Sequence, residues 1–165
     1  RFIMEENETS KKLLLRFVNP VKELFIVIQN QEDKDNNDYF NYKNVENTNF
    51  PLNEQIDKLA LSFNNEDRIV DDIANALFLR QLQPMSSHTR VPDRFFYNYS
   101  FALDPENHLP TGQVNMSRIQ NKVLRIDTTS NTKKRDVRIY ARSYNILRIQ
   151  HGLAGVLFTD NNFVN

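Results

Sequence analysis

The three histidines are the side chains of this sequence best suited to metal binding or acid–base catalysis. His88, His108 and His151 lie in separate segments of the chain. No two of them stand at an HxH, HxxxH or HExxH spacing, which would turn two imidazole rings toward one metal ion. Cysteine is absent, which excludes a thiolate nucleophile, a disulfide and a cysteine-based zinc site. The sequence therefore predicts no metal ligand, and it disfavours a metal-dependent cupin enzyme, whose histidines would be clustered.

Two acids and one serine are the remaining candidates for catalysis. Asp104 and Glu106 flank Pro105 and could form the pair of carboxylates that a glycosidase uses. Acids on either side of a proline in a turn are far more often capping residues exposed to solvent. Ser117 would need a strained elbow to act as a nucleophile, and the chain contains no GxSxG sequence that builds one. We therefore expect no catalytic residue and no cofactor-binding residue.

Two short segments could contact nucleic acid. The basic run Lys133–Arg135 could bind phosphate, but the chain has 21 basic and 21 acidic residues and a formal net charge of zero. We predict instead that this run is a charged hairpin tip that keeps a sheet edge soluble. Gly152–Gly155 has the GxxG spacing of an RNA-binding KH loop, yet no pair of helices brackets it. The sequence thus predicts no specific nucleic-acid partner.

Aromatic and asparagine residues in loops offer two further sites. Tyr39, Phe40 and Tyr42 lie in a polar stretch and could stack on a sugar, which leaves a lectin-like carbohydrate-binding module as an alternative function. Three asparagines begin an Asn-x-Ser/Thr sequon, which is an acceptor for N-glycosylation: Asn7, Asn98 and Asn115. Asn98 lies in the middle of a predicted strand, and the amino terminus is not a secretory signal.

Extended segments dominate the predicted secondary structure. The run Leu24–Ile28 is continuously apolar, which predicts a strand buried on both faces. An aromatic strand from Phe96 ends in a loop bracketed by Pro105 and Pro110. Apolar residues at three- and four-residue spacing predict one short helix over Asp67–Leu79. The strands are expected at 11–19, 21–29, 56–63, 96–101, 114–119, 122–127, 137–150 with a bend near Ser143, and 156–159.

The connections between these segments are polar. We expect a long surface loop over Asn30–Pro51 and a hairpin connection over Thr128–Asp136. Short strands, one short helix and polar connections predict an all-β fold, an antiparallel sandwich in a single domain over residues 1–165. No apolar run approaches the roughly 18 to 20 residues that span a bilayer, so no transmembrane segment is expected. The chain begins with Arg1, which suggests a piece of a longer protein.

Four motifs in order resemble those of the major capsid proteins of nucleocytoplasmic large DNA viruses, of the iridovirus and phycodnavirus kind. The family forms read approximately HPVKEL, QPYxHHT, YSFALxPEEHQPSGxxNFSRI and YNxLRIxxGxxGLxYSN. This chain has NPVKEL from Asn19, QPMSSHT from Gln83, YSFALDPENHLPTGQVNMSRI from Tyr99 and YNILRIQHGLAGVLFTDN from Tyr144. Small departures, such as Asn19 for histidine, leave the virus lineage open.

The resemblance implies a structural protein of the virion and no enzyme. It implies the carboxy-terminal jelly roll of a double-jelly-roll protein, with the first strands of that jelly roll upstream of Arg1. Three copies of such a protein form a pseudo-hexagonal capsomer that tiles an icosahedral shell. The implied partners are the other chains of a homotrimer, neighbouring capsomers and minor capsid proteins, and the implied place of assembly is the host cytoplasm.

Overall fold

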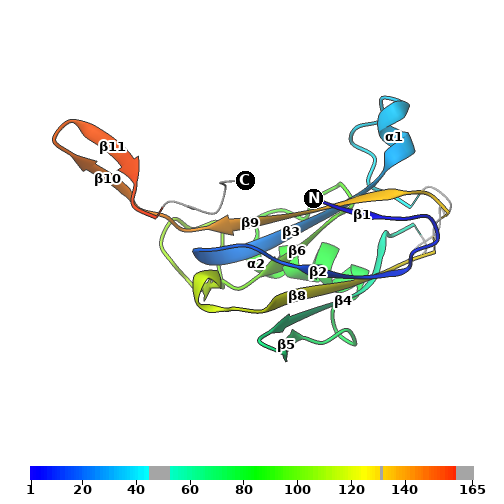
Figure 1. Cartoon of the computed structure of the whole chain (residues 1–165), viewed down its shortest axis with the longest axis horizontal. Coiled ribbons are helices and arrows are strands. Elements are labelled where there is room, and N and C mark those ends of the chain that lie inside the picture. Colours follow the sequence, from blue (N-terminus) through cyan, green and yellow to red (C-terminus); the bar gives the residue numbers. More distant parts are fainter. Residues whose placement is uncertain (45–52, 131, 159–165) are drawn as a thin grey trace.

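Two antiparallel sheets face each other in the computed structural model, which describes residues 1–44, 53–130 and 132–158 (Figure 1). In the first sheet the order is β1 (Phe2–Met4), β9 (Arg135–Ser143), β3 (Pro20–Asn30) and β6 (Phe96–Ser100), and β7 (Val114–Asn115) also pairs with β3. In the second sheet the order is β2 (Ser10–Leu14), β8 (Lys122–Thr128), β4 (Ile56–Phe63) and β5 (Glu66–Ile69).

The strand order identifies a jelly roll. With the two-residue strand β7 left aside, the first sheet contains the first, eighth, third and sixth strands of the sandwich, and the second sheet contains the second, seventh, fourth and fifth. Eight strands arranged as two Greek keys define this fold. The prediction of an all-β antiparallel sandwich is confirmed. β1 and β2 hold the first and second positions in this order.

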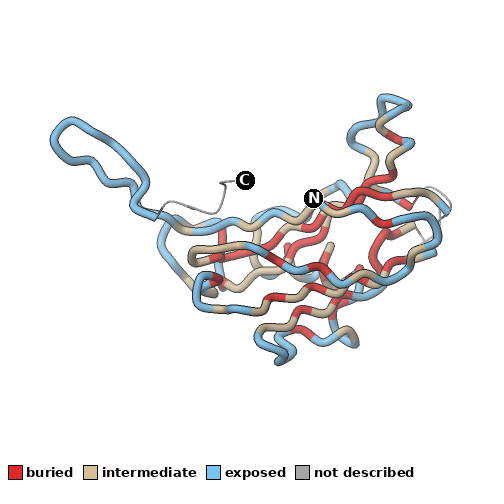
Figure 2. Tube along the Cα trace, viewed as in Figure 1, coloured by how far each residue is buried: buried red, intermediate tan, exposed pale blue. Residues whose placement is uncertain are grey.

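The core lies between the two sheets (Figure 2). From the first sheet, Leu24, Ile26 and Ile28 of β3 point into it, and Leu61 of β4 and Leu124 of β8 face them from the second sheet. β3 is the central strand, since it pairs with β9 on one side and β6 on the other. On its other face Phe25 and Val27 are only half-buried, so the prediction of a strand buried on both faces holds fully for the core-facing side alone.

The helix predicted over Asp67–Leu79 is wrong. Residues 66–69 form the edge strand β5, and Ile69 enters the core from it. The helical segment starts only at residue 76 and consists mainly of a π-helical turn, η1 (Phe78–Leu82), that continues into α2 (Gln83–Ser87). The apolar spacing misled because Val70 and Ile73 are exposed and do not form a buried stripe. Pro84 does not end the helix, because it lies in the first turn of α2, where a missing amide donor costs least.

Several predicted boundaries also change. Residues 30–51 are not wholly loop, because α1 (Gln31–Asp35) lies there; residues 45–51 of that range fall outside the described residues. The strand expected at 11–19 ends at Leu14. The strand expected at 114–119 is β7 followed by a 3₁₀ turn, η2 (Met116–Arg118).

The chain after Ser143 forms a separate hairpin. The strand predicted at 137–150 breaks just after Ser143, where a bend was expected, and resumes as β10 (Leu147–Gln150). β11 (Leu153–Val156) pairs with β10 and lies earlier than the final strand predicted at 156–159, whose last residue falls outside the described residues. Figure 1 shows this hairpin projecting beyond one end of the sandwich.

The predicted hairpin connection over Thr128–Asp136 is wrong as well. β8 belongs to the second sheet and β9 to the first, so this segment crosses from one sheet to the other. Within the described ranges, no helix is both long and apolar enough to span a membrane.

Candidate functional site

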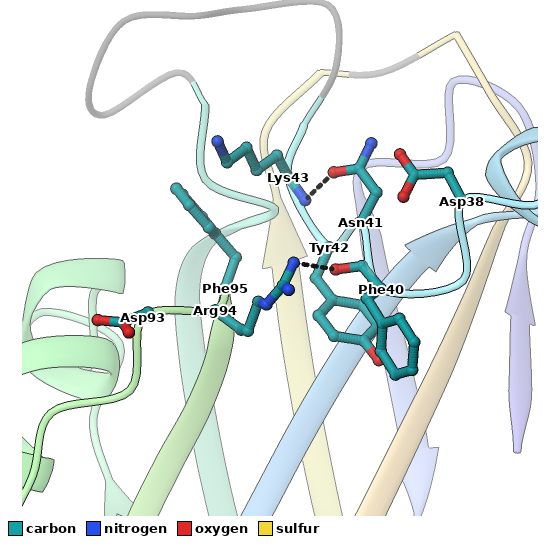
Figure 3. Close-up of a pocket in the computed structure, with 8 residues that line it drawn as sticks. All are labelled: Asp38, Phe40, Asn41, Tyr42, Lys43, Asp93, Arg94 and Phe95. Atoms are coloured by element: carbon teal, nitrogen blue, oxygen red, sulfur yellow. Dashed lines mark hydrogen bonds between the residues drawn. The ribbon is translucent and has the colours of Figure 1, made fainter.

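A hollow of about 550 Å³ lies among loops at one end of the sandwich (Figure 3). One wall follows α1 and the other is the segment that leads into β6. The residues that line the hollow are Asp38, Phe40, Asn41, Tyr42, Lys43, Asp93, Arg94 and Phe95. The lining thus combines three aromatic rings with two acids and two bases, and its formal charge is balanced.

Hydrogen bonds to backbone carbonyls shape the wall that follows α1. The amide of Asp38 donates to the carbonyl of Asp33 at 2.7 Å, and the Gln29 side chain donates to the carbonyl of Tyr39 at 2.9 Å. Gln55 donates to the carbonyl of Lys43 at 2.8 Å. Arg94 joins the two walls, because its Nη1 donates to the carbonyl of Phe40 at 3.4 Å (Figure 3). The shape of the hollow therefore depends on hydrogen bonds that backbone carbonyls accept, mostly from side chains.

Phe95 makes cation–π contacts with two basic side chains. The guanidinium of Arg80 lies 4.4 Å from the centre of its ring and the ammonium of Lys43 lies 5.4 Å from it. Arg80 is in turn fixed by the buried carboxylate of Glu54, at 2.7 Å. The Tyr97 hydroxyl donates to the same carboxylate at 2.9 Å. Sequence reasoning missed this support, and no local signal marks it, since Glu54 lies 26 residues from Arg80 and 43 from Tyr97.

The lining of the hollow is suited to binding a ligand and not to holding a metal ion. Among the described residues no three His, Cys, Asp or Glu side chains are grouped closely enough to hold a metal ion. An exposed aromatic ring beside carboxylate and amide groups is suited to a polar ligand with an apolar face, such as a sugar ring. Phe40 and Tyr42, two of the three aromatics predicted for that role, line the hollow, whereas Tyr39 lies outside the lining and donates to Asn37 at 3.0 Å.

The structure does not bring the three histidines together. His88 lies just after α2, His108 is exposed in the proline-bracketed loop, and His151 lies at the tip of the β10–β11 hairpin. His88 Nε2 is 2.9 Å from Oε2 of Glu23, a fully buried carboxylate. Arg142 and Asn98 also donate to that carboxylate, at 3.0 and 3.2 Å. This cluster ties β3, β6, β9 and α2 together.

Ser87, His88 and Glu23 superficially resemble a Ser-His-Glu triad. Ser87 Oγ lies 3.0 Å from His88 Nδ1, opposite the ring nitrogen that faces Glu23. A catalytic serine must give its proton to the histidine. Here the Ser87 hydroxyl donates to the carbonyl of Gln83 at 2.7 Å, so its proton is already engaged with the helix backbone. The arrangement anchors the end of α2 and does not activate a nucleophile.

Asp104 and Glu106 are loop-shaping residues in the structure. Asp104 Oδ1 accepts from the amides of Glu106 and Asn107 at 3.1 and 3.2 Å, which closes the turn. Glu106 reaches a different loop and accepts from the amide and the hydroxyl of Thr89 at 3.1 and 3.2 Å. Ser117 Oγ accepts from the amide of Asn19 at 2.8 Å. All three side chains hold backbone segments in place.

The basic run Lys133–Arg135 is not the solvated tip that was predicted. Arg135 is fully buried and donates to the carbonyl of Glu8 at 2.7 Å and to the hydroxyl of Thr128 at 3.0 Å. Lys133 pairs with Glu32 at 2.6 Å, and Lys134 pairs with Glu5 at 3.0 Å. The prediction failed because this connection leads from β8 in the second sheet to β9 in the first. It does not join two neighbouring strands of one sheet. The Gly152–Gly155 segment is the turn and strand of a β hairpin.

The three sequons differ in accessibility. Asn7 lies exposed in the turn between β1 and β2, with a positive φ of 60°. Asn98 is 1% exposed, and its amide donates to Glu23 and to the carbonyl of Leu24. Asn115 is exposed, and its Oδ1 accepts from the amide of Ser117 at 3.1 Å. Burial therefore closes the sequon at Asn98 in the folded protein.

Comparison of the sequence with known proteins assigns the chain to a family. The profile described as "Large eukaryotic DNA virus major capsid protein" matches residues 1–155. The major capsid protein of Chrysochromulina ericina virus is 38% identical over 104 residues, which are 61% of this chain and 18% of that protein. The major capsid protein of Pyramimonas orientalis virus is 28% identical over 180 residues, 94% of this chain and 40% of that protein. The resemblance predicted from the four motifs is thus confirmed.

Solved structures share the fold. The structure described as PBCV-1 VP54 fitted into a reconstruction of the virophage Sputnik has a TM-score of 0.73 and 22% identity, and the match covers 92% of this chain and 46% of that one. A quasi-atomic model of the PBCV-1 virus capsid has a TM-score of 0.72 and 23% identity, over 96% of this chain and 50% of that one. The prediction that this chain is not an enzyme agrees with the matched family profile and the curated relatives, which are named as major capsid proteins.

Proposed function

Because the chain belongs to the family of large eukaryotic DNA virus major capsid proteins, we propose that it builds a virus shell as one jelly roll of a longer capsid protein. The chain spans about a fifth of the length of the first curated relatives that it matches and about half of the matched solved chains. The observation that carries the proposal is the complete eight-strand jelly-roll order within a chain whose family match runs from residue 1 to 155. A second jelly roll in the longer protein accounts for the remaining length.

The proposed mechanism is trimer formation followed by lateral packing. Three copies of a protein with two similar jelly rolls present six similar lobes, which gives a pseudo-hexagonal block from a threefold assembly. Such blocks tile the faces of an icosahedral shell. The described part of this chain suits the role, since its titratable groups serve as loop caps and cross-strand ties, and no residue is proposed to be catalytic. The partners are the other two copies, neighbouring capsomers and minor capsid proteins, and assembly takes place in the host cytoplasm.

The oligomeric state of the longer protein tests this proposal. We expect the purified protein to run as a stable trimer in size-exclusion chromatography with light scattering, and to form hexagonal arrays visible by electron microscopy. A protein that stays monomeric at high concentration and never assembles would contradict the proposal. Sequencing upstream of Arg1 gives an independent check, since a second run of jelly-roll strands is expected there.

A second candidate function is carbohydrate binding in the loop hollow, because the structure places Phe40 and Tyr42 there beside Asp38 and Asp93. Substituting Phe40→Ala removes a ring that is 66% exposed and contributes no core packing. If the hollow binds a sugar, this variant loses glycan-array binding while its stability is unchanged. Tyr39→Ala, just outside the hollow, is the matched control. Wild-type protein that binds no glycan on the array would rule this function out.

A further inference from the structure

His88 has a hydrogen-bond partner at each of its two ring nitrogens. Nε2 lies 2.9 Å from Oε2 of Glu23, and Nδ1 lies 3.0 Å from Oγ of Ser87. A neutral imidazole carries one proton, so it donates at one nitrogen and accepts at the other. The number of protons that the ring needs therefore depends on whether either partner has a proton to give it.

Neither partner has such a proton. The carboxylate of Glu23 is fully buried and also accepts from Arg142 at 3.0 Å, a charge-assisted contact that is typical of an ionised carboxylate. The Ser87 hydroxyl has a single proton, which it donates to the carbonyl of Gln83 at 2.7 Å. Both hydrogen bonds of the ring are thus complete only when each nitrogen of His88 carries a proton.

The polar groups around this contact come from β9, β6 and the loops on either side of β6. Arg142 opposes a positive charge on His88, because both share one carboxylate, but its side chain is half exposed and water weakens the repulsion. Asn98 gives the carboxylate a neutral donor at 3.2 Å. Glu106 accepts from the amide of Thr89, the residue after His88, at 3.1 Å. The surroundings thus supply a second acid against one half-exposed base.

The ring lies where α2 ends. His88 is the first residue after α2, and its amide closes the last turn by donating to the carbonyl of Pro84 at 2.8 Å. The chain then runs through Arg94 and Phe95, which line the hollow, into β6. The contact of His88 with β3 therefore holds both the end of α2 and the start of one wall of the hollow on the first sheet.

We propose that His88 is a proton-controlled latch. With a proton on each nitrogen, the ring fastens the end of α2 to the buried Glu23. When the ring loses one proton to solvent, either Nδ1 is left facing the oxygen of Ser87, or the Ser87 hydroxyl turns toward Nδ1 and leaves the carbonyl of Gln83. One hydrogen bond is lost in both cases, and the contact with Glu23 is no longer one between opposite charges. The latch uses contacts within this chain and does not rest on the proposed shell function.

The protons on the ring can be counted directly. Nitrogen-15 NMR distinguishes an imidazolium from both neutral forms of histidine, and H88Q identifies the signals by their loss. Histidine changes charge in proteins between about pH 5 and about pH 8. At about pH 5.5 we expect both nitrogens of His88 to carry protons, and at about pH 8 only one of them. A ring with one bare nitrogen throughout this range, or one that keeps both protons throughout it, would overturn the proposal.

Hydrogen exchange tests whether this proton controls the end of α2. Protection of the residue 88 amide, corrected for the intrinsic effect of pH, should fall about fivefold to tenfold between about pH 5.5 and about pH 8, as expected for the loss of one hydrogen bond. In H88Q, whose side-chain amide donates to Glu23 but takes up no proton, protection should be the same at both pH values. Exposed His108→Gln is the control and should behave as wild type.

Amides of β8 in the second sheet should keep their protection at both pH values, which separates release of the latch from loss of the whole fold. Wild-type protection at residue 88 that is independent of pH, or that falls equally in H88Q, would contradict the latch. The wild-type comparison decides this even if H88Q does not fold.

A pair of neighbouring serines tests the part played by the hydroxyl. Ser87→Ala removes the acceptor of the Nδ1 proton, so the second proton stabilises the contact less and most of the pH dependence at residue 88 should disappear. Ser86→Ala is the matched control, because the Ser86 hydroxyl donates to the same Gln83 carbonyl at 2.9 Å. That variant should keep the pH dependence of wild type. Equal pH dependence in S87A and S86A would show that the serine does not set the protonation of His88, and the proposal would fail.

Discussion

Single buried polar residues connect the two sheets of this jelly roll, and Tyr97 is the clearest case. It extends from β6 of the first sheet, and its hydroxyl accepts from the amides of Gln55 and Ile56 at the start of β4 in the second sheet, at 2.9 and 3.2 Å. The same hydroxyl donates to Glu54. Burial, reinforced by the Glu54 carboxylate, raises the pKa of Tyr97, so the group stays a neutral donor.

Replacing Tyr97 by phenylalanine should therefore destabilise the fold. The change leaves two buried amides and a carboxylate without a shared partner, which costs about 1 to 3 kcal/mol. The free energy of unfolding from urea titration measures this loss. Tyr140→Phe in β9, where the side chain is 53% exposed, is the matched control and should change stability by less than about 0.5 kcal/mol. Equal stability of Y97F and wild type would show that the hydroxyl contributes nothing to holding the sheets together.

Asp136 predicts how stability depends on pH. Burial would raise the pKa of this carboxyl, but hydrogen bonds from Lys34, Gln31 and Arg1 outweigh that effect and lower the pKa to about 2, from an ordinary 3.8. A carboxyl whose folded pKa is depressed stabilises the protein above its unfolded pKa and loses that contribution as the pH falls through the folded value. The shift corresponds to about 2 kcal/mol.

Asp136→Asn should lower the free energy of unfolding by about 2 kcal/mol at neutral pH. The difference from wild type should shrink as the pH falls from about 4 to about 2, since wild-type Asp136 then gains a proton. Denaturant titrations at several pH values measure it. Asp35→Asn, at an exposed site in α1, serves as control. A difference that stays constant over this range would exclude the ionised carboxylate as its source.

At the scale of elements, one glycine sets the path of the proline-bracketed loop that leads into β7. Gly112 has a φ of +148°, and a Cβ added there would lie 2.8 Å from the carbonyl oxygen of Phe101 and 3.1 Å from Cα of Ala102. Those neighbours are backbone atoms and cannot rotate away. The loop therefore closes on the end of β6 only because this residue has no side chain.

Gly112→Ala should destabilise the protein by about 1 to 3 kcal/mol, because the backbone must shift to relieve both the contact and the strained φ. Gly155→Ala is the control, since nothing lies within 4 Å of a Cβ at that position. Melting temperatures of the two variants should separate clearly, with that of G155A close to wild type. Similar melting temperatures would mean that the loop relaxes around the added methyl group.

Elements with a local signal were predictable, and elements defined by distant partners were not. The apolar run at Leu24–Ile28 predicted β3, and the strand expected at 122–127 corresponds to β8. The false helix over Asp67–Leu79 came from apolar residues at helical spacing that share no face, since Ile69 of the edge strand is buried whereas Val70 and Ile73 are exposed. Turn-forming residues predicted a hairpin before β9, but pairing to a different sheet is decided by residues more than a hundred positions away.

In the candidate site, too, residues with a local sequence signal were predictable and those that depend on distant partners were not. Phe40 and Tyr42 were predicted as loop aromatics, and they do line the hollow. The residues that support it, Glu54 and Arg80, carry no local pattern, because an ion pair formed on folding leaves no periodicity in the sequence. The turn residues around Asp104 predicted a capping role, and in the structure its carboxylate accepts from the amides of Glu106 and Asn107.

At the scale of the whole molecule, the order β1-β9-β3 makes the two ends of the jelly roll neighbours. Phe2 pairs with Val137 and Met4 with Arg135, so the first strand of the fold has no partner until the eighth has been made. Pairings this distant in sequence close late and slowly, because the intervening chain must be ordered first.

A chain that ends at residue 134 should consequently fail to fold, although it contains seven of the eight sandwich strands. Proteolysis should degrade it quickly, whereas a chain that ends at Ser143 should resist. A protease-resistant product ending at 134 would contradict this expectation.

The position of β9 between β1 and β3 therefore delays completion of the first sheet during synthesis. While the ribosome is still making the chain, β3 lacks a neighbour on one side and the first sheet is open between β1 and β3. That opening closes only after residue 143 has left the exit tunnel, so the sandwich is completed after almost all of it has been translated. An interrupted product has no finished first sheet, so we expect it to remain unfolded and open to the cell's proteases.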